Sequence, residues 1–243
     1  MKQSLSAEWL KLRHSRIGIV LAVLPVISLL IGCANYALNR EVLTNGWYSL
    51  WTQVSLFYGE FFLPILVAIV CAWVCRLEHL NRNWNLVMTA PVPVAAVFMA
   101  KWIAASLLIL LAKAMFMGLY GIAGLLLALP GPFPAETIGW ALRGWYACLS
   151  ISALQLGLSL RIRSFAVPVG FSLAAVLIGL GLYVAKWGIY FPYSLLTIGM
   201  HVLSRDALDP LREALFWTVN AGYGLLFAAW SVRGLKGRDA VTG

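Results

Sequence analysis

Two ionisable side chains lie deep inside apolar stretches of this 243-residue sequence. Glu60 precedes Cys75 by 15 residues and Lys113 follows Lys101 by 12 residues, which corresponds to depths of roughly 18–22 Å if both stretches are helical. A lone charge at mid-bilayer costs at least about 2.5–3.5 kcal/mol on insertion scales, so each is expected to face protein or water. We predict that Glu60 and Lys113 pair, within one subunit or across a subunit interface. The functional interpretation is a polar lining of a path through the membrane; the alternatives are a structural ion pair and a lysine that snorkels to the interface.

Cysteine and histidine are the other side chains here that could do chemistry. Cys71 and Cys75 share one face of a predicted helix, but no His or carboxylate completes a metal site, and all four cysteines lie in apolar runs, which predicts simple packing. His14, His79 and His201 show no spacing typical of a catalytic or metal set, so we expect them exposed at headgroup level. No G-x-x-x-x-G-K-S/T phosphate loop, H-E-x-x-H or G-x-S-x-G motif occurs. We therefore expect no catalytic residue, metal or cofactor bound by this chain.

Composition indicates the solvent in which these residues lie. The chain is 62% hydrophobic and only 11% charged, with a mean hydropathy of +0.86, whereas soluble domains are roughly 45–50% apolar and about 25% charged. The net charge of +9 comes from Lys and Arg at the ends of apolar runs and forms no continuous basic face. The sequence therefore predicts a membrane protein that contacts lipid and no nucleic acid.

The apolar runs predict the elements that position the candidate residues. A spanning helix needs roughly 20 apolar residues, and six runs reach that length, near residues 17–38, 49–75, 102–129, 137–160, 164–185 and 214–232. Between the last two runs, residues 186–213 are mixed in composition and too short in apolar content to span. Five tryptophans near the ends of spans are expected at the membrane interfaces: Trp47, Trp51, Trp102, Trp140 and Trp187. The predicted fold class is all-α membrane, with six transmembrane helices in one domain, 1–243.

The distribution of basic residues predicts the orientation of these spans. Twelve Lys and Arg residues lie at the ends that include both termini and the loops after the second and fourth spans, and five lie at the opposite ends. Because cytoplasmic loops carry the excess of Lys and Arg, both termini are predicted to be cytoplasmic.

A short amphipathic segment precedes the first span. In residues 3–16, Leu5, Trp9 and Leu12 recur at i, i+4 and i+7, while basic residues lie elsewhere around the helix. This pattern is typical of an interfacial helix in the headgroup region. The alternative is a basic flank that only sets topology, which leaves the apolar stripe unexplained.

The loop at residues 76–101 contains a second amphipathic pattern. We predict a helix from about Glu78 to Met88, with Leu80, Trp84 and Met88 at i, i+4 and i+8, and Pro91 after its end. Such a helix lies on the headgroups or docks into a groove of a partner protein. A plain connector between two spans is the remaining alternative.

The layout and several short motifs resemble a known family. The N-terminal AEWLKLRHSRIG and the EHLNRNWNLVMTAPVPVAAVFMAKW after the second span resemble the six-helix permease subunits of type 2 ABC exporters, and most closely the lantibiotic-immunity permeases. The motifs that carry the resemblance are Asn83-Trp84-Asn85, Ala90-Pro91-Val92-Pro93, Ala100-Lys101 and Phe191-Pro192-Tyr193-Ser194.

The resemblance implies roles for three segments. The loop 76–101 would hold the coupling helix that contacts a separate ABC ATPase, with candidate contacts at Glu78, Asn83, Trp84 and Met88. Residues 3–16 would be the interfacial elbow helix, and 186–213 would hold short re-entrant helices on the outer side.

The resemblance also implies partners and cargo. The ATPase, in two copies, would bind ATP and Mg²⁺, and a second permease subunit would complete a heteromeric pair in the bacterial cytoplasmic membrane. The cargo would be an amphipathic, cationic peptide antibiotic. The alternatives are a same-fold exporter of another antibiotic or a lipid-like molecule, an ion-coupled secondary carrier, and a membrane-embedded enzyme.

Overall fold

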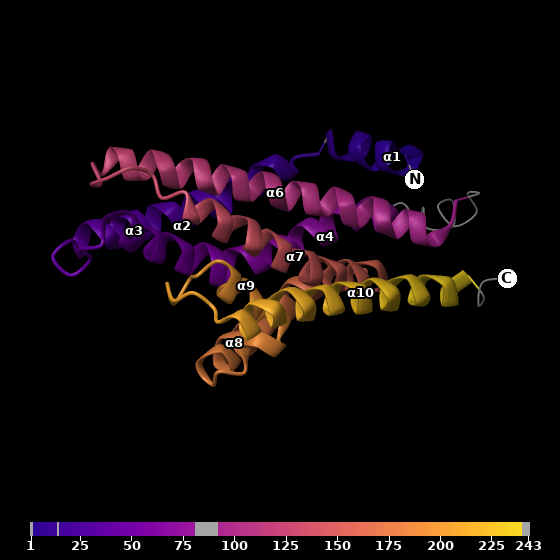
Figure 1. Ribbon diagram of the computed structural model, residues 1–243. Helices are drawn as coiled ribbons and strands as arrows, with labels where there is room; N and C mark the ends of the chain where they lie inside the picture. The colour runs from indigo at the N-terminus through magenta and orange to yellow at the C-terminus, as the bar shows by residue number, and fades with distance from the viewer. Residues whose placement is uncertain (1, 14, 81–91, 240–243) are drawn as a thin grey trace.

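The computed structural model describes residues 2–13, 15–80 and 92–239, which form helices joined by short turns (Figure 1). Within these ranges there is no strand. The elements are α1 (Lys2–Arg13), α2 (Ile17–Leu38), α3 (Gly46–Ser55), the π-helical η1 (Leu56–Phe62), α4 (Leu63–Leu80), α6 (Val94–Leu126), α7 (Glu136–Arg161), α8 (Ala166–Val184), the 3₁₀ turn η2 (Gly188–Tyr190), α9 (Pro192–Gly199) and α10 (Pro210–Asp239).

The long helices run side by side along one axis, and both chain termini lie at the same end of the bundle (Figure 1). We call this the proximal end and the opposite one the distal end. The last residue of α4 and the first of α6 are also proximal, whereas the turn between α2 and α3 is distal.

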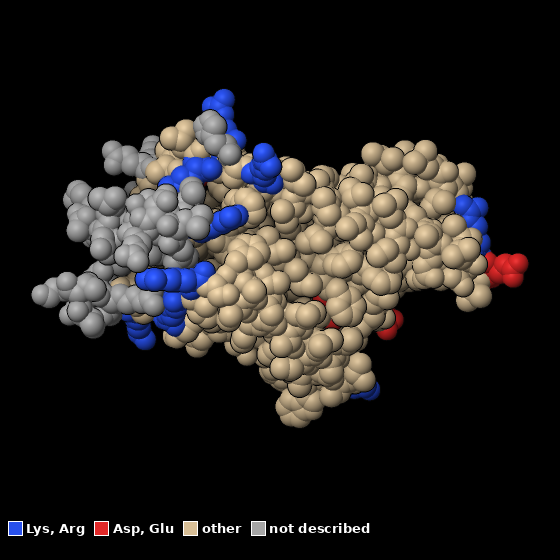
Figure 2. All heavy atoms as spheres, turned by 180° about the vertical axis from the view of Figure 1, so that it is seen from behind, with Lys and Arg blue, Asp and Glu red and all other residues tan. Residues whose placement is uncertain are grey.

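Five segments in the described part of the chain are long and apolar enough to cross a membrane: Ile17–Leu38, Gly46–Arg76, Val94–Leu126, Ala166–Val184 and Pro210–Leu235. Large apolar side chains on these helices are exposed, as expected of surfaces that face lipid. On the face seen in Figure 2, uncharged residues cover the middle of the molecule and Lys and Arg gather at the proximal end.

The helix α7 is missing from those five because its composition is more polar. It is 26 residues long and packs against α4, α6, α8, α9 and α10, so it lies inside the bundle. Its buried face includes Ser150, Ser152, Gln155 and Ser159. A helix enclosed by other helices can be more polar than a helix that faces lipid. The sixth span at α7 therefore agrees with this composition but stays a prediction.

The third predicted span begins earlier in the structure than in the sequence analysis. The helix starts at Val94, directly after Pro93, about two turns before residue 102. In the structure Lys101 is inside the helix and its side chain is fully buried.

The distal core is built on aromatic rings, so three of the tryptophans predicted at the membrane interfaces are buried in protein; their level in the membrane stays a prediction. Trp47, Trp51 and Trp140 are 7%, 0% and 7% exposed. Trp51 packs edge-on against Tyr120, with ring centroids 5.3 Å apart, and its indole N–H donates to the backbone carbonyl of Met200. Burial is favourable because the rings of Trp47 and Trp51 each find both an apolar surface and a hydrogen-bond acceptor. Of the five, Trp187 is well exposed, at 64%.

Candidate functional sites at the two ends of the bundle

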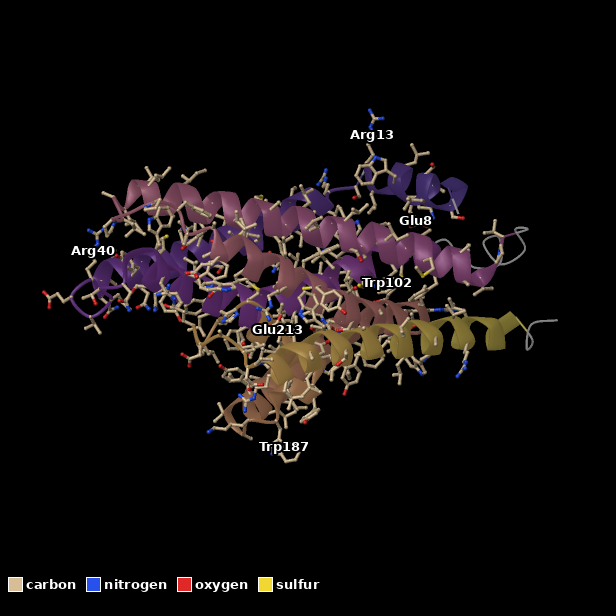
Figure 3. All side chains as sticks on the ribbon, viewed as in Figure 1. Glu8, Arg13, Arg40, Trp102, Trp187 and Glu213 are labelled. Carbon is tan, nitrogen blue, oxygen red and sulfur yellow. The ribbon has the colours of Figure 1, made fainter. Side chains whose placement is uncertain are left out.

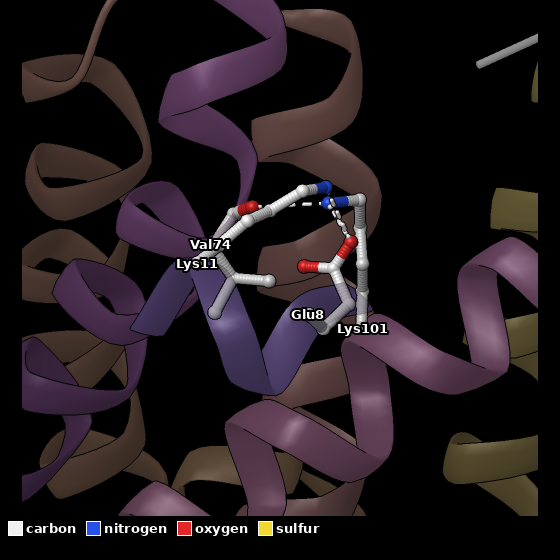
Figure 4. Close-up of polar contacts among 4 residues, drawn as sticks. All are labelled: Glu8, Lys11, Val74 and Lys101. Carbon is white, nitrogen blue, oxygen red and sulfur yellow. Dashed lines mark hydrogen bonds and ion pairs between the residues drawn. The ribbon is translucent and has the colours of Figure 1, made fainter. Parts of the chain in front are cut away.

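A buried cluster of charges joins three helices at the proximal end (Figure 4). The Lys101 Nζ atom lies 3.0 Å from the Glu8 Oε1 atom and donates to the Val74 carbonyl oxygen at 3.0 Å. Lys11 donates to the same Glu8 oxygen at 2.9 Å. Glu8 is 5% exposed and Lys101 is 0% exposed. We call Glu8, Lys11, Val74 and Lys101 the proximal clamp.

The proximal clamp links the N-terminal helix to the two helices on either side of residues 81–91. Glu8 belongs to α1, Val74 to α4 and Lys101 to α6. Removing one partner of a buried ion pair leaves the other charge without compensation, which is strongly destabilising. The clamp therefore fixes α1, the C-terminal part of α4 and the N-terminal part of α6 to one another.

The predicted apolar stripe of α1 is divided between two faces. Leu5 and Leu12 are half-buried on the same side as Glu8, whereas Trp9 is 56% exposed. Arg13 points away from the bundle in Figure 3. Leu5, Glu8 and Leu12 form the packed face of α1. The periodicity of apolar residues alone does not reveal this face, because Glu8 is charged. The interfacial position of residues 3–16 stays a prediction.

One of the four predicted ATPase contacts lies where α4 ends. Glu78 is in the last turn of α4, which continues to Leu80. Asn83, Trp84 and Met88 lie outside the described residues. Their role as coupling contacts stays a prediction.

The two deep ionisable residues do not pair within the chain. The Glu60 Oε2 atom, in η1, accepts a hydrogen bond of 2.5 Å from the hydroxyl of Thr197. The Lys113 Nζ atom donates to the Met200 Sδ atom at 3.3 Å and lies 6.0 Å from the ring centroid of Tyr58. Glu60 and Lys113 are 4% and 2% exposed within the single chain; a pair across a subunit interface and a polar lining of a path stay predictions.

A matched depth, on which the predicted pair was based, does not fix the direction of a side chain. Glu60 lies in a seven-residue π-helical segment, and its i→i+5 bonding turns side chains relative to a continuous α-helix. Such segments are frequent at functional sites. Both deep residues instead hold the short helix α9 and the residue after it, through Thr197 and Met200.

Two glycines allow this end of α9 to approach its neighbours. A Cβ atom on Gly144 of α7 would lie 2.3 Å from the Met200 Cγ atom and 2.8 Å from the Lys113 Nζ atom. A Cβ atom on Gly59 of η1 would lie 3.2 Å from the Met200 Sδ atom. Neither glycine was singled out by the sequence analysis, because a glycine inside an apolar run carries no positional signal by itself.

A pocket of about 540 Å³ opens beside α9 at the distal end. Its lining includes Tyr183, Lys186, Thr197, His201, Asp206 and Arg212. His201 is 6% exposed, so the predicted exposed position is wrong: its ring packs on Trp140, with centroids 4.9 Å apart.

The surroundings of His201 set its charge state. This residue lies outside the five membrane-spanning segments. Burial lowers its pKa below the ordinary value of 6.5; Arg143 lowers it further, and the Ser204 carbonyl and the acids Glu213 and Glu136 oppose this. Glu213, labelled in Figure 3, pairs with Arg143 and links α10 to α7. The ring is therefore neutral at pH 7.

Comparison with known families decides what kind of protein holds these sites. Residues 4–179 match the family model described as ABC-2 family transporter protein. The chain belongs to this family. No curated protein matches the chain at a significant level. The chain is thus a multi-pass ABC-2 membrane permease.

The matched residues contain the proximal clamp and both deep ionisable residues of this ABC-2 permease, and they end before α9 and His201. Membership implies an ABC ATPase as a partner on another chain. Among the described residues, no group of three or more His, Cys, Asp or Glu side chains is placed to hold a metal ion.

Proposed function

We propose that this ABC-2 permease is one subunit of an ATP-driven exporter that removes a lantibiotic-type peptide antibiotic from the bacterial cytoplasmic membrane. ATP and Mg²⁺ would bind to a separate ATPase subunit. The observation that carries the coupling part of the proposal is the proximal clamp. It fixes α1, α4 and α6 together on both sides of residues 81–91, the stretch whose sequence resembles a coupling helix.

The clamp supports a direct route from the ATPase to the bundle. Lys101 and Val74 are 27 residues apart in sequence and share a hydrogen bond of 3.0 Å. A displacement of the intervening loop would move α4 and α6 together with α1, because a buried ion pair resists separation. Glu78, Asn83, Trp84 and Met88 are the proposed contacts with the ATPase.

At the distal end, α9 would move when cargo leaves. Glu60 in η1 and Lys113 in α6 hold the C-terminal part of this short helix, through a carboxylate–hydroxyl bond and a weak ammonium–thioether contact. Thioether sulfur is a weak acceptor, so the second contact breaks at low cost.

The proposed assembly follows from topology. With α7 as a sixth span, both termini are cytoplasmic, which agrees with their position at one end of the bundle (Figure 1). Two permease subunits, forming a heteromer, and two ATPase copies would complete the exporter, since six helices cannot readily enclose a path on their own.

Co-purification tests the ATPase contact. The chain is co-expressed with a candidate ABC ATPase subunit, and the complex is isolated in detergent. Trp84→Ala is expected to abolish co-elution, whereas Trp187→Ala, which changes an exposed tryptophan at the distal end, is expected to preserve it. Co-elution of both variants would contradict the proposed contact.

Susceptibility measurements test the cargo. A strain that lacks the permease is expected to become more sensitive to at least one lantibiotic in a panel, and the intact gene should restore resistance. Unchanged sensitivity across the panel would exclude the peptide cargo. Sensitivity to another antibiotic, or altered export of a lipid-like molecule, would instead favour a different cargo for the same exporter.

A further inference from the structure

A second pocket, of about 390 Å³, lies towards the proximal end, between α4 and the turn that joins α7 to α8. We call it the arginine pocket. Its lining includes Trp73 and Arg76 from α4, and Arg163, Ser164 and Phe165 from the turn. Among the described residues that line it, these two arginines are cationic and none is acidic. The pocket therefore carries charge of one sign, which selects an anion.

Both arginine side chains are open to a ligand. Arg76 and Arg163 are exposed, and neither side chain forms an ion pair or a hydrogen bond with another residue in the described part of the chain. The Arg76 guanidinium carbon lies 5.4 Å from the centroid of the Trp73 ring. This cation–π contact positions the guanidinium group and leaves its N–H donors available.

The position of the pocket along the spans indicates where the anion comes from. Trp73 lies inside the membrane-crossing segment Gly46–Arg76, and Arg76 is its last residue. Phe165 directly precedes α8, the crossing helix Ala166–Val184. Two span ends therefore meet at the pocket, at the level at which the apolar interior of a bilayer gives way to the lipid phosphates. Basic pockets between transmembrane helices bind anionic lipid headgroups at this level.

Apolar side chains continue from the pocket along α8. Phe165, Val167 and Phe171 are exposed, and the last two lie one turn apart on the same face of the helix. The acyl chains of a lipid whose phosphate occupies the pocket would cover this face. A soluble anion or an acidic peptide would leave it unused, so the adjoining apolar face favours a lipid.

We propose that the arginine pocket binds the phosphate group of an anionic phospholipid. The N–H groups of Arg76 and Arg163 donate to the phosphate oxygens, a pairing that suits the fork geometry of arginine, and the acyl chains lie on the exposed face of α8. Phosphocholine binds more weakly, because it adds a quaternary ammonium group beside two cations. The proposal needs only the multi-pass membrane placement of this chain, so it does not rest on the export function.

Native mass spectrometry of the full-length chain in detergent tests this site. Phosphatidylglycerol and phosphatidylcholine with identical acyl chains are titrated as a matched pair, which separates the effect of the headgroup from that of the chains. The wild type is expected to bind at least one phosphatidylglycerol about tenfold more tightly than phosphatidylcholine. Inorganic phosphate at the same concentration is expected not to displace the lipid. Displacement would identify a soluble anion as the ligand and overturn the proposal.

Variants locate the binding in the pocket. The double variant Arg76→Gln/Arg163→Gln should weaken phosphatidylglycerol binding at least about tenfold. Arg16→Gln/Arg40→Gln, which removes the same charge from two exposed arginines outside the pocket, should not weaken it. Equal affinity of the wild type for the two lipids, unchanged affinity in the pocket variant, or equal weakening in the two double variants would overturn the proposal. If the pocket variant fails to fold, Arg163→Gln provides the same comparison against Arg40→Gln.

An acidic segment of a partner ATPase is another anion that could reach the proximal end. In that case the pocket variant would lose co-elution with a candidate ATPase and retain its affinity for phosphatidylglycerol, which would overturn the lipid proposal. If no ATPase co-elutes with the wild type, the proposed export function fails. The lipid measurement is unaffected by that result, because it uses this chain alone.

Discussion

Lys101 and Lys113 lie on the same helix and are both buried, but their ammonium groups have different partners. Lys101 has a carboxylate at 3.0 Å and a backbone carbonyl at 3.0 Å. Lys113 has a thioether sulfur at 3.3 Å and an aromatic ring at 6.0 Å. The desolvation cost of a buried charge is offset at the first site and scarcely offset at the second. The proximal end is therefore built as a fixed unit, and the distal region contains groups that can change partners at low cost.

The largest expected effect is at the proximal clamp. Lys101→Met leaves the Glu8 carboxylate buried with Lys11 as its remaining ammonium partner in the clamp, so the protein should lose about 3–5 kcal/mol of stability. Thermal unfolding of the detergent-solubilised chain measures this. The double variant with Glu8→Gln removes both charges and should recover part of the loss. If Lys101→Met unfolds at the wild-type temperature, the clamp is not the fixed unit described above.

The next largest effect is expected where Gly144 packs against Met200 and Lys113. Gly144→Ala places a methyl group 2.3 Å from the Met200 Cγ atom and 2.8 Å from the Lys113 Nζ atom. Overpacking of this kind costs about 1–3 kcal/mol. Gly118→Ala on α6 is the matched control, since a Cβ atom there meets nothing within 4 Å. Equal unfolding temperatures for the two variants would show that the Met200 contact is loose.

A smaller effect is expected from pH at His201, the residue after Met200. Its folded-state pKa lies below the ordinary 6.5, so folding favours the neutral ring. The contribution is fully present above pH 6.5 and declines as the pH falls below it. Between pH 7.5 and 5.5 the loss should be at most on the order of 1 kcal/mol. The difference in unfolding temperature between these two pH values should shrink in His201→Asn; an unchanged difference would assign the pH effect to other groups.

The smallest effect is expected at Lys113. Lys113→Met removes an ammonium group whose nearest acceptor is a thioether, and replacement of buried charges by apolar residues of similar volume is often neutral or stabilising. The unfolding temperature should stay at or above that of the wild type. A loss as large as that of Lys101→Met would erase the contrast between the two lysines.

Hydropathy predicted the positions of the long apolar helices. Unpaired backbone N–H and C=O groups are costly in lipid, so a long apolar segment has few structures available besides a helix. The predicted first run, 17–38, covers the same residues as α2 (Ile17–Leu38). The helix α7 shows the limit of this signal: a helix surrounded by protein can bury serine and glutamine, so its composition alone does not identify it as a span.

Hydropathy could not predict which side chains contact one another. The partners of Lys101, Glu60 and Lys113 depend on rotation about helix axes, and η1 alters that rotation without any proline or other marker in its sequence, LFYGEFF. The ends of several helices could not be predicted from the sequence either. Ala128, Lys186 and His201 adopt the left-handed conformation that usually favours glycine after the end of a helix, so that position is not a glycine after α6, α8 or α9.

The proximal clamp also has a consequence for how the protein is made. Glu8 and Lys101 are 93 residues apart in sequence. At about 5–20 residues per second, a ribosome needs about 5–20 s to cover that distance. During this interval α1 has been synthesised and the lysine that will hold it has not. The N-terminal helix therefore docks late, and its locking marks the moment at which the third span has taken its place beside the second.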